Sequence, residues 1–404
     1  MRVLFVSDVY FPRVNGVSTS IRTFRDDLAA AGVETLLVAP EYPGAPPDAE
    51  TGIIRIPSGS VPLDPEDRRF HSRPLAQALD AALAARVDLV HVHTPFIAHY
   101  AARRFARQHG LPLVATYHTY FEDYLHHYVP VLPRGIGRFL ARAFTRSQCR
   151  DVAALVAPSG PMRDALLAYG VETPIEVLPT GLPATSYRRG DGARFREKFG
   201  IEANRPMLLY VGRVAYEKNI DFLLRMFVRV HARWPDTLFV IAGEGPARSH
   251  LMSLAHELDV ASSVRFIGYL DRNTDLLDCY AAGNVFVFAS RTETQGLVLL
   301  EAMAQGTPVV STAELGTHSI LTPGCGAFIV PEDEESFAAA VLQALALPGD
   351  DARRGELLAH AQAWASQAMA RRLIAFYEKV RAKSQRSRQE TGRGPAGAPS
   401  RVDS

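Results

Sequence analysis

The segment FASRTETQGLVLLEAM, at residues 288–303, decides the fold of this chain. The apolar run Val285–Phe288 predicts a buried strand, and after a polar loop Gly296 opens an apolar helix. A second apolar run, Pro308–Ser311, follows that helix. Strand, helix and strand in this order predict a βαβ unit, in which the two strands lie parallel in one sheet.

The same alternation continues along the rest of the chain. Short apolar runs rich in β-branched residues predict strands at Val3–Val6, Leu36–Val38, Leu89–His91, Leu113–Thr116, Ala154–Ala157, Ile175–Val177, Met207–Val211, Leu238–Ala242 and Val264–Phe266. Longer amphipathic runs predict helices at Val17–Ala31, Pro74–Ala85, Phe96–His109, Asn219–Arg233, Ser336–Leu347 and Gln362–Arg381. This pattern is typical of parallel sheets that helices cover on both faces.

One stretch, Leu178–Gly192, is rich in Pro, Thr, Ser and Gly and predicts a linker between two domains. We expect an α/β fold of two Rossmann-like, doubly wound parallel-sheet domains, at residues 1–182 and 193–360. A crossover helix at 361–381 and a disordered tail at 382–404 would follow. Ligands of such sheets bind beyond the carboxyl ends of the strands, so the two domains should face each other across a cleft that holds the site.

Composition excludes several classes of protein. The 404 residues carry 44 Lys and Arg against 43 Asp and Glu, so an overall charge suited to nucleic acid is absent. The three cysteines lie far apart, which argues against a disulfide framework or a zinc ribbon and fits a reducing cytoplasm. The apolar run Val3–Val6 is too short for a signal peptide, and no run reaches about 18 apolar residues. We expect a soluble or peripheral protein.

Charged side chains cluster where predicted strands end in the C-terminal half. Glu293 lies in the loop before the helix that Gly296 opens, and Glu301 lies further along that helix. The N–H groups and positive dipole end of a helix N-terminus bind a diphosphate, and carboxylates on either side accept hydrogen bonds from sugar hydroxyls. Arg213 and Lys218 follow another strand, where fixed cations would stabilise a leaving diphosphate. Taken singly, each of these residues also fits an ordinary solvated helix cap.

Two glutamates with seven residues between them, followed by AMAQGTPVV at 302–310, resemble the signature of the retaining glycosyltransferases of family four. The resemblance covers nearly the whole chain. It implies the GT-B fold, with the acceptor bound by the N-terminal domain and the nucleotide sugar by the C-terminal domain. It also implies that Glu293 contacts the donor sugar and that Glu301 binds the ribose hydroxyls.

The same resemblance assigns the diphosphate to backbone groups and cations. It implies that the backbone at Gly296, Leu297 and Val298 meets the β-phosphate. Arg213 and Lys218 would stabilise the leaving diphosphate. With no obvious covalent nucleophile in the chain, we expect front-face attack in which the leaving phosphate takes the proton of the acceptor.

Three further positions at predicted strand ends match the family. Gly16 precedes the first helix, where family members place a glycine against the donor diphosphate, and Gly243 lies in a turn that resembles the nucleotide loop. His118 resembles the active-site histidine beside the donor sugar and the acceptor. Arg248 replaces the third glycine of a dinucleotide fingerprint that Gly243 would begin, which disfavours a nicotinamide-linked oxidoreductase. For both glycines a simple tight turn is the alternative.

The resemblance implies no cofactor, because the nucleotide sugar, expected to be a UDP-sugar, is itself a substrate, and we expect no metal. His91 and His93 alternate along one predicted strand and could form a metal site, but no Asp-x-Asp motif lies at a strand end. The acids at 332–335 stand at a helix start, where they complement the helix dipole. A metal-independent reaction follows, in which Arg213 and Lys218 replace the cation.

Arginines that recur every four residues predict a basic stripe along one helix. The stripe consists of Arg134, Arg138, Arg142, Arg146 and Arg150. Apolar residues occupy the other faces of this helix, and such a helix binds an anionic membrane surface. An ordinary surface helix whose arginines pair elsewhere in the fold is the alternative.

Two segments, TYHTYFEDY at 116–124 and TETQGL at 292–297, are similar to the bacterial diacylglycerol glucosyltransferases. This narrower resemblance implies transfer of a hexose from a UDP-sugar, with UDP-glucose as the first candidate, to 1,2-diacylglycerol. The enzyme would be peripheral on the cytoplasmic face of the inner membrane. Phosphatidylinositol, a polysaccharide or a soluble sugar is the alternative acceptor. A phosphorylase-like enzyme with pyridoxal phosphate and a non-catalytic nucleotide-sugar-binding protein are two rival functions for the same fold.

Overall fold

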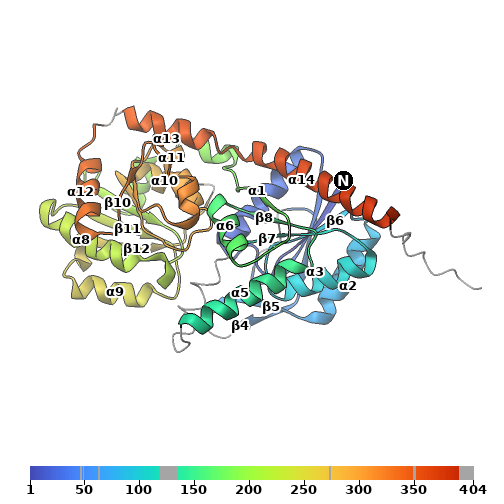
Figure 1. Cartoon of the computed structure of the whole chain (residues 1–404). Helices are drawn as coiled ribbons and strands as arrows, with labels where there is room; N and C mark the ends of the chain where they lie inside the picture. The colour runs from blue at the N-terminus through green and yellow to red at the C-terminus, as the bar shows by residue number, and fades with distance from the viewer. Residues whose placement is uncertain are drawn as a thin grey trace, which may run out of the picture.

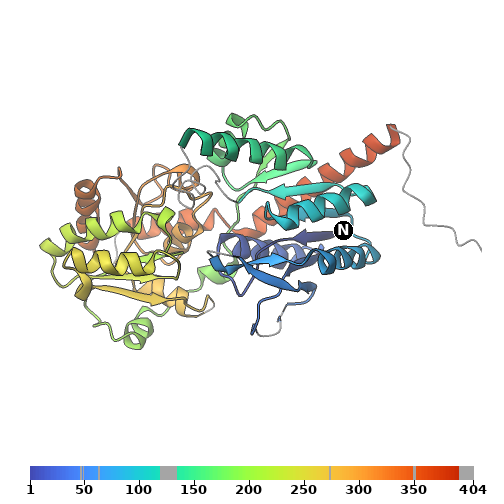
Figure 2. The same cartoon turned by 90° about the horizontal axis from the view of Figure 1, so that it is seen from below.

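The computed structural model describes residues 1–45, 48, 50–61, 64–118, 134–272, 274–348 and 352–390. Two parallel sheets form the cores of two domains that lie side by side (Figure 1). Figure 2 shows the same two domains from below, with helices packed around each sheet. The predicted α/β architecture of two Rossmann-like domains is therefore confirmed.

The N-terminal sheet has seven strands in the order β3-β2-β1-β6-β7-β8-β9. Its strands are β1 (Arg2–Val6), β2 (Glu34–Pro40), β3 (Ile53–Ile56), β6 (Leu89–Val92), β7 (Leu113–Thr116), β8 (Ala154–Ala157) and β9 (Ile175–Val177). The strand order reverses between β1 and β6. The loops that follow these two strands therefore separate and leave a crevice at the carboxyl edge of the sheet.

Alternate residues of β1 pack on opposite faces of this sheet. Val3 and Phe5 belong to the core formed with α1 and α14, whereas Leu4 and Val6 pack with residues of α2, α3, α5 and α6. All four side chains are fully buried, which explains the uninterrupted apolar run. The helices are α1 (Gly16–Ala30), α2 (Ser72–Ala84), α3 (Ile97–His109), α5 (Arg134–Arg150), α6 (Gly160–Ala168) and α14 (Ser366–Glu390).

The C-terminal sheet has six strands in the order β12-β11-β10-β13-β14-β15, and its order reverses between β10 and β13. Its strands are β10 (Met207–Val211), β11 (Leu238–Ala242), β12 (Val264–Gly268), β13 (Val285–Phe288), β14 (Val309–Ser311) and β15 (Phe328–Ile329). Its helices are α7 (Gly192–Lys198), α8 (Ile220–Arg233), α9 (Arg248–Glu257), α10 (Asp275–Ala282), α11 (Leu297–Ala304), α12 (Glu334–Leu345) and α13 (Ala352–Gln362).

The structure extends the predicted pattern with elements whose sequences are short or polar. An antiparallel hairpin of β4 (Ser58–Val61) and β5 (Asp64–Phe70) lies outside the main sheets. The sequence DPEDRRF of β5 lacks the apolar alternation that predicts a half-buried strand. The predicted terminal helix is divided, because α13 ends at Gln362 and α14 begins at Ser366.

Helix α14 returns from the C-terminal domain and lies along the N-terminal domain (Figure 1). Its side chains Leu373 and Tyr377 are fully buried in the N-terminal core. The structure corrects the expected disordered tail for residues 382–390, because α14 continues to Glu390. The Arg381 guanidinium, at the residue before this extension, donates to Asp88 Oδ1 at 2.8 Å and fixes the helix to the domain. Residues 391–404 lie outside the described residues.

Two segments of chain connect the domains and lie against each other. The Leu182 N–H donates to the Trp364 carbonyl at 2.7 Å, and the Ser366 N–H donates to the Leu182 carbonyl at 2.9 Å. A Cβ atom added to Gly181 would lie 2.4 Å from the Ser366 Cα and 2.7 Å from the Trp364 carbonyl oxygen. Glycine at this position therefore permits the close contact between the two connections.

We expect Gly181→Ala to lower the free energy of unfolding by about 1–3 kcal/mol, because the three atoms nearest to the added methyl group are backbone atoms, which cannot move aside as the end of a flexible side chain can. Gly355→Ala is the matched control, because it makes the same change inside α13 where no atom lies within 4 Å. Alanine should stabilise that helix slightly. Urea denaturation of both variants measures the difference, and equal stabilities would contradict the close contact.

Candidate active site

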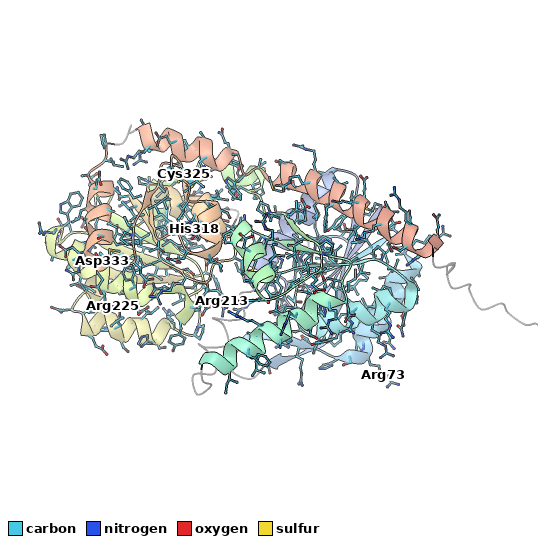
Figure 3. The ribbon with its side chains drawn as sticks, in the orientation of Figure 1. Arg73, Arg213, Arg225, His318, Cys325 and Asp333 are labelled. Carbon is cyan, nitrogen blue, oxygen red and sulfur yellow. The ribbon has the colours of Figure 1, made fainter. Side chains whose placement is uncertain are left out.

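A cavity of about 750 Å³ lies between the carboxyl ends of the two sheets. All ten residues with predicted catalytic or donor-binding roles line it: Gly16, His118, Arg213, Lys218, Gly243, Glu293, Gly296, Leu297, Val298 and Glu301. Figure 3 marks Arg213 where the two domains meet. We therefore identify this cleft as the candidate active site.

The N-terminus of α11 forms part of the cleft wall. Its N-cap, Gly296, has φ +95°, a left-handed conformation that favours glycine, and makes no side-chain cap. A Cβ there would also lie 3.1 Å from Thr317 Cγ2. Leu297 and Val298 continue the wall into the first turn, where an α-helix leaves its first N–H groups without intrahelical carbonyl partners; later in this turn the Leu299 N–H donates to the Gly296 carbonyl at 3.0 Å. This edge of the cleft attracts anions.

Lys218 and Glu293 meet across the ends of two strands. Lys218 Nζ donates to Glu293 Oε1 at 2.6 Å, and both side chains are mostly buried. Lys218 precedes Asn219, whose side-chain amide donates to the Ala289 carbonyl at 3.1 Å and ties this loop to the end of β13. The pair therefore places a cation and a carboxylate at fixed positions beside the α11 N-terminus.

Arg213 lies on the same wall, shortly after β10. Its carbonyl accepts a hydrogen bond from the Tyr210 hydroxyl at 3.0 Å, and its guanidinium lies 3.7 Å from Glu217 Oε1. Burial, together with the nearby carboxylates of Glu293 and Glu217, raises the pKa of Tyr210 well above its usual value. The phenol therefore stays protonated and holds the arginine loop as a hydrogen-bond donor.

Glu301 lines the cleft from α11 and is 5% exposed, and it has partners that the sequence did not suggest. The Tyr280 hydroxyl donates to Glu301 Oε2 at 2.8 Å, and the Arg272 guanidinium pairs with Glu301 Oε1. Arg272 also lines the cavity, although no motif marked it. Each carboxylate oxygen has two lone pairs, so Glu301 keeps acceptor capacity for ribose hydroxyls.

Glycine backbones close the strand ends beneath the cleft. Gly243 has φ +141°, and its N–H donates to the Gly268 carbonyl at 2.8 Å. A Cβ on Gly243 would lie 1.9 Å from the Gly212 carbonyl oxygen. Gly243 is therefore required where two backbones touch at the cleft floor, which is a stronger constraint than a simple turn imposes.

Gly16 faces the same space from the N-terminal domain, at the first residue of α1. Asn15 caps this helix, because its Oδ1 accepts from the Ser18 N–H at 2.9 Å. No atom lies within 4 Å of a Cβ added to Gly16, so the helix start is open to the cleft. Asp8, which no motif marked, orders the neighbouring loops by accepting from the Ala98 N–H at 3.0 Å.

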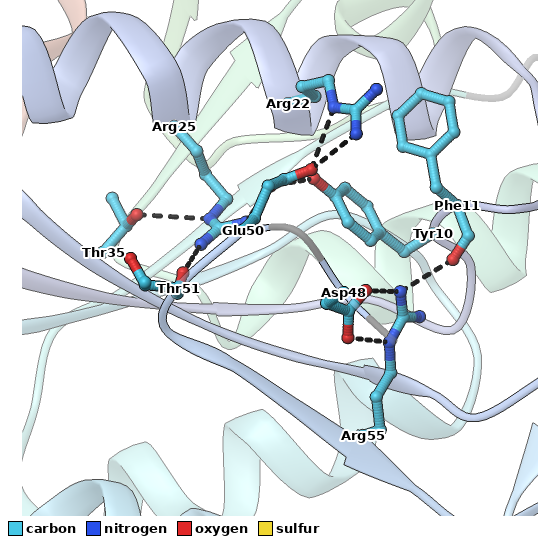
Figure 4. A network of polar contacts seen from close by, with 9 residues as sticks. All are labelled: Tyr10, Phe11, Arg22, Arg25, Thr35, Asp48, Glu50, Thr51 and Arg55. Carbon is cyan, nitrogen blue, oxygen red and sulfur yellow. Dashed lines mark hydrogen bonds and ion pairs between the residues drawn. The ribbon is translucent and has the colours of Figure 1, made fainter. Parts of the chain in front are cut away.

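A partly buried polar network holds the loop between β1 and α1 in place (Figure 4). Glu50 accepts hydrogen bonds from the Tyr10 hydroxyl at 2.7 Å and from the guanidinium groups of Arg22 and Arg25 at 2.6–2.9 Å. Arg55 donates to the Phe11 carbonyl at 2.8 Å. The network therefore fixes the segment that leads to the open start of α1.

Histidines form a buried row that ends at the cleft. His118 Nε2 lies 3.4 Å from His93 Nδ1, and the rings of His93 and His91 have centroids 4.1 Å apart. His91 bonds to the Tyr377 hydroxyl at 2.6 Å and to the Thr116 hydroxyl at 2.7 Å. Burial lowers the pKa of His118 to about 4, so its imidazole is neutral at pH 7. A neutral imidazole is suited to hydrogen bonding with a sugar hydroxyl.

The histidine row offers little to a metal ion. Both nitrogens of His91 already have partners on α14 and β7. Within the described ranges, no three His, Cys, Asp or Glu side chains lie close enough to share an ion. The free cysteines Cys149, Cys279 and Cys325 are buried.

The predicted basic stripe lies on α5. The guanidinium of Arg142 lies 5.2 Å from the centre of the Tyr169 ring, and Arg146 lies beside Gly170. Both arginines thus contact the fold, although they remain exposed. The side chains of Arg134 and Arg138 lie outside the described residues, as do residues 119–133, which include most of the aromatic segment after His118.

Comparison with known proteins gives the family. Residues 14–185 match the model of Glycosyltransferase Family 4, and residues 191–358 match that of Glycosyl transferases group 1. The chain is 33% identical to the alpha-monoglucosyldiacylglycerol synthase of Streptococcus pneumoniae, over 85% of this chain and 78% of the relative. The chain belongs to glycosyltransferase family four. The resemblance inferred from the paired glutamates is thereby confirmed.

Other relatives of this family-four glycosyltransferase are similar at lower identity. A GDP-mannose-dependent alpha-mannosyltransferase of Mycobacterium tuberculosis is 27% identical, over 83% of this chain and 85% of the relative. The solved sucrose-phosphate synthase from Thermosynechococcus elongatus superposes with a TM-score of 0.77 at 22% identity, covering 95% of this chain and 99% of that one. Proteins similar to this chain in sequence or in fold therefore have names that give different donors and products.

We expect the free energy of unfolding of this glycosyltransferase to fall as the pH is lowered from about 6.5 toward 4. Burial lowers the pKa of His91 to about 3, and those of His99 and His118 to about 4. Below pH 6.5 these histidines bind protons in the unfolded chain but remain neutral in the folded protein. Each should remove about 1.4 kcal/mol per pH unit, and the effect should vanish above pH 6.5, where both states are neutral.

Chemical denaturation at several pH values measures this slope. His99→Gln removes one contributing histidine, which lies away from the donor residues. The slope of the free energy of unfolding against pH should therefore be shallower by about 1.4 kcal/mol per pH unit, the contribution of one bound proton. Identical slopes for this variant and the unaltered protein would contradict the buried neutral state of His99.

Proposed function

We propose that this glycosyltransferase moves a hexose from a UDP-sugar to a membrane lipid, with retention of configuration and without a metal ion. UDP-glucose and 1,2-diacylglycerol are the first candidates for donor and acceptor. This proposal rests chiefly on the Lys218–Glu293 pair beside the open N-terminus of α11. Similarity over most of the chain to a monoglucosyldiacylglycerol synthase supports the choice of substrates.

The donor would lie along the C-terminal wall of the cleft. Its diphosphate would accept hydrogen bonds from the first N–H groups of α11 and from the cationic side chains of Arg213 and Lys218. Glu301 would accept from the ribose hydroxyls and Glu293 from a hydroxyl of the sugar. As the bond from the sugar to the diphosphate breaks, the cations would stabilise the charge that develops on the leaving phosphate.

The acceptor hydroxyl would approach from the N-terminal domain. On the proposed front-face path, its oxygen bonds to the anomeric carbon on the side that the diphosphate leaves, and its proton passes to the leaving phosphate oxygen. His118, neutral and half-buried at the cleft wall, would donate to or accept from a hydroxyl of the transferred sugar. Closure of the cleft would exclude water and so limit hydrolysis.

The membrane contact would lie on the first half of α5. Ile136, Phe139 and Leu140 share one side of this helix and are 53%, 64% and 48% exposed. Exposed apolar residues next to a basic stripe are what an interfacial helix requires, because they enter the lipid while the arginines meet its phosphates. This surface supports peripheral contact with a membrane, which we propose is the cytoplasmic face of the inner membrane. No helix in the described part of the chain is both long and apolar enough to span a bilayer.

A second candidate keeps the site and changes the substrates. The similar mannosyltransferase is named for GDP-mannose, so a GDP-sugar donor or another acceptor also fits the family. A panel of UDP- and GDP-sugars, supplied in mixed micelles with and without diacylglycerol, separates these candidates. One new glycolipid from one donor supports the proposal. Hydrolysis of the donor without a glycolipid product would point to another acceptor. No turnover of any donor would favour a non-catalytic binding protein.

With the donor that the panel identifies, Lys218→Ala and Glu293→Ala should each lower kcat by about 10²–10³-fold, since each removes a group that acts on the developing charge or fixes its partner. Lys198→Ala is the matched control, because Lys198 also pairs with a carboxylate, Asp275 at 2.8 Å, but lies on α7 away from the cleft. The rate of product formation, measured for each variant and for the unaltered protein, tests this prediction. Unaltered rates in both cleft variants would refute the site.

The double variant Ile136→Ser with Phe139→Ser should reduce binding to anionic vesicles by about tenfold or more, because each buried apolar side chain contributes about 1.5 kcal/mol or more. Met252→Ser with Leu358→Ser is the control, since these residues are 40% and 38% exposed on the other domain. Vesicle sedimentation measures the bound fraction. Equal losses in both double variants would remove the role of α5.

A further inference from the structure

A glutamine in the loop at residues 292–296, which we call the donor loop after its proposed role, contacts the connection between the two domains at residues 178–182. Gln295, directly before Gly296, is 5% exposed, and its side-chain amide bonds twice to the backbone of Thr180. The Thr180 N–H donates to Gln295 Oε1 at 2.8 Å, and Gln295 Nε2 donates to the Thr180 carbonyl at 2.5 Å. One side chain thus satisfies both backbone polar groups of a buried residue in a segment 115 residues away.

The contact continues into the N-terminal domain. The Thr180 hydroxyl bonds to the Ser20 hydroxyl at 2.7 Å, and both residues are almost fully buried. Ser20 lies on α1, about one turn after Gly16, which opens on the cleft. A chain of hydrogen bonds therefore leads from the start of α11 through the connection to the start of α1.

We infer that Gln295 is a positioning residue that couples occupation of the donor loop to the placement of the N-terminal domain. The two helix N-termini that face the cleft, at Gly16 and Gly296, lie on different domains. Among the described residues, the Gln295–Thr180–Ser20 chain joins the loop before one to the first turns of the other. A donor that orders residues 292–296 would thereby also order residue 180 and α1.

Breaking the contact between Gln295 and Thr180 would cost free energy. Both partners are buried, so a movement of the donor loop that breaks the amide contact leaves two backbone groups of Thr180 without hydrogen bonds. Each unsatisfied buried group costs about 1–3 kcal/mol, so the loop and the connection should move together. The ordered protein would then bring both helix N-termini to the same diphosphate.

The test uses the full chain, UDP as the probe, and hydrogen–deuterium exchange. In the unaltered protein, UDP should slow exchange in α11, in the connection 178–182 and in the first turns of α1. In Gln295→Leu, which removes both amide contacts at similar volume, α11 should keep its protection. Protection of the connection and α1 by UDP should fall by about fivefold.

Gln305→Leu is the matched control. Gln305 also bonds to three backbone groups, the carbonyls of Ser186 and Arg188 and the N–H of Gly190, all at 2.9 Å, but it lies at the other end of α11. This variant should lose stability as Gln295→Leu does, yet keep the UDP-dependent protection of α1. Equal loss of coupling in both variants, or no protection of α1 by UDP in the unaltered protein, would overturn the inference.

A second readout rests on the proposed transferase function. Gln295→Leu should lower kcat by about tenfold or more, because reacting groups held on different domains lose their alignment. Its affinity for UDP should stay within about threefold, since the C-terminal domain holds the nucleotide. If the unaltered protein transfers no sugar but UDP still protects α1 through Gln295, the proposed function fails and the coupling stands. Normal kcat in Gln295→Leu with transfer intact would overturn the coupling.

Discussion

An α-helix leaves its first N–H groups without carbonyl partners, and the cleft is arranged around those of α11. Gly296 allows the chain to turn into this helix with a left-handed backbone and no side chain in the way. The Lys218–Glu293 pair lies beside it. Because β10 and β13 are the strands at which the sheet order reverses, the loops that follow them open at one place.

The N-terminal domain contributes a surface fixed by partly buried hydrogen bonds from the arginines of α1 to Glu50 and by a buried one from the start of α3 to Asp8. Its buried histidines are neutral because burial opposes their charge. His118, at the end of the histidine row, lines the cleft, and under the proposed function its neutral imidazole would face the acceptor while Lys218 would place positive charge beside the donor. This division suits a reaction in which negative charge develops on only one of the two substrates.

The sequence predicted what depends on local pattern. The apolar runs at Leu113–Thr116 and Val285–Phe288 coincide with β7 and β13, because a strand buried on both faces admits few polar residues. Glu293 and Glu301, which the structure places in the lining of the cleft, could be predicted because their spacing along the chain is itself the signal. Gln295 was missed because its partners are backbone atoms of a distant residue, which every amino acid supplies. Arg272 was missed because its ion pair with Glu301 joins two elements whose packing no local pattern encodes.

The return of α14 has a consequence for how this architecture is recombined. Helix α14 contributes Leu373 and Tyr377 to the core of the first domain, and the Tyr377 hydroxyl is bonded to His91. Dividing the chain at the linker therefore separates the first domain from side chains of α14 that form part of its core. Chimaeras that exchange donor halves between related enzymes would have to keep residues 366–390 with the parent of the first half. The structural unit made of the first domain and residues 366–390 is thus discontinuous in sequence although it is continuous in space.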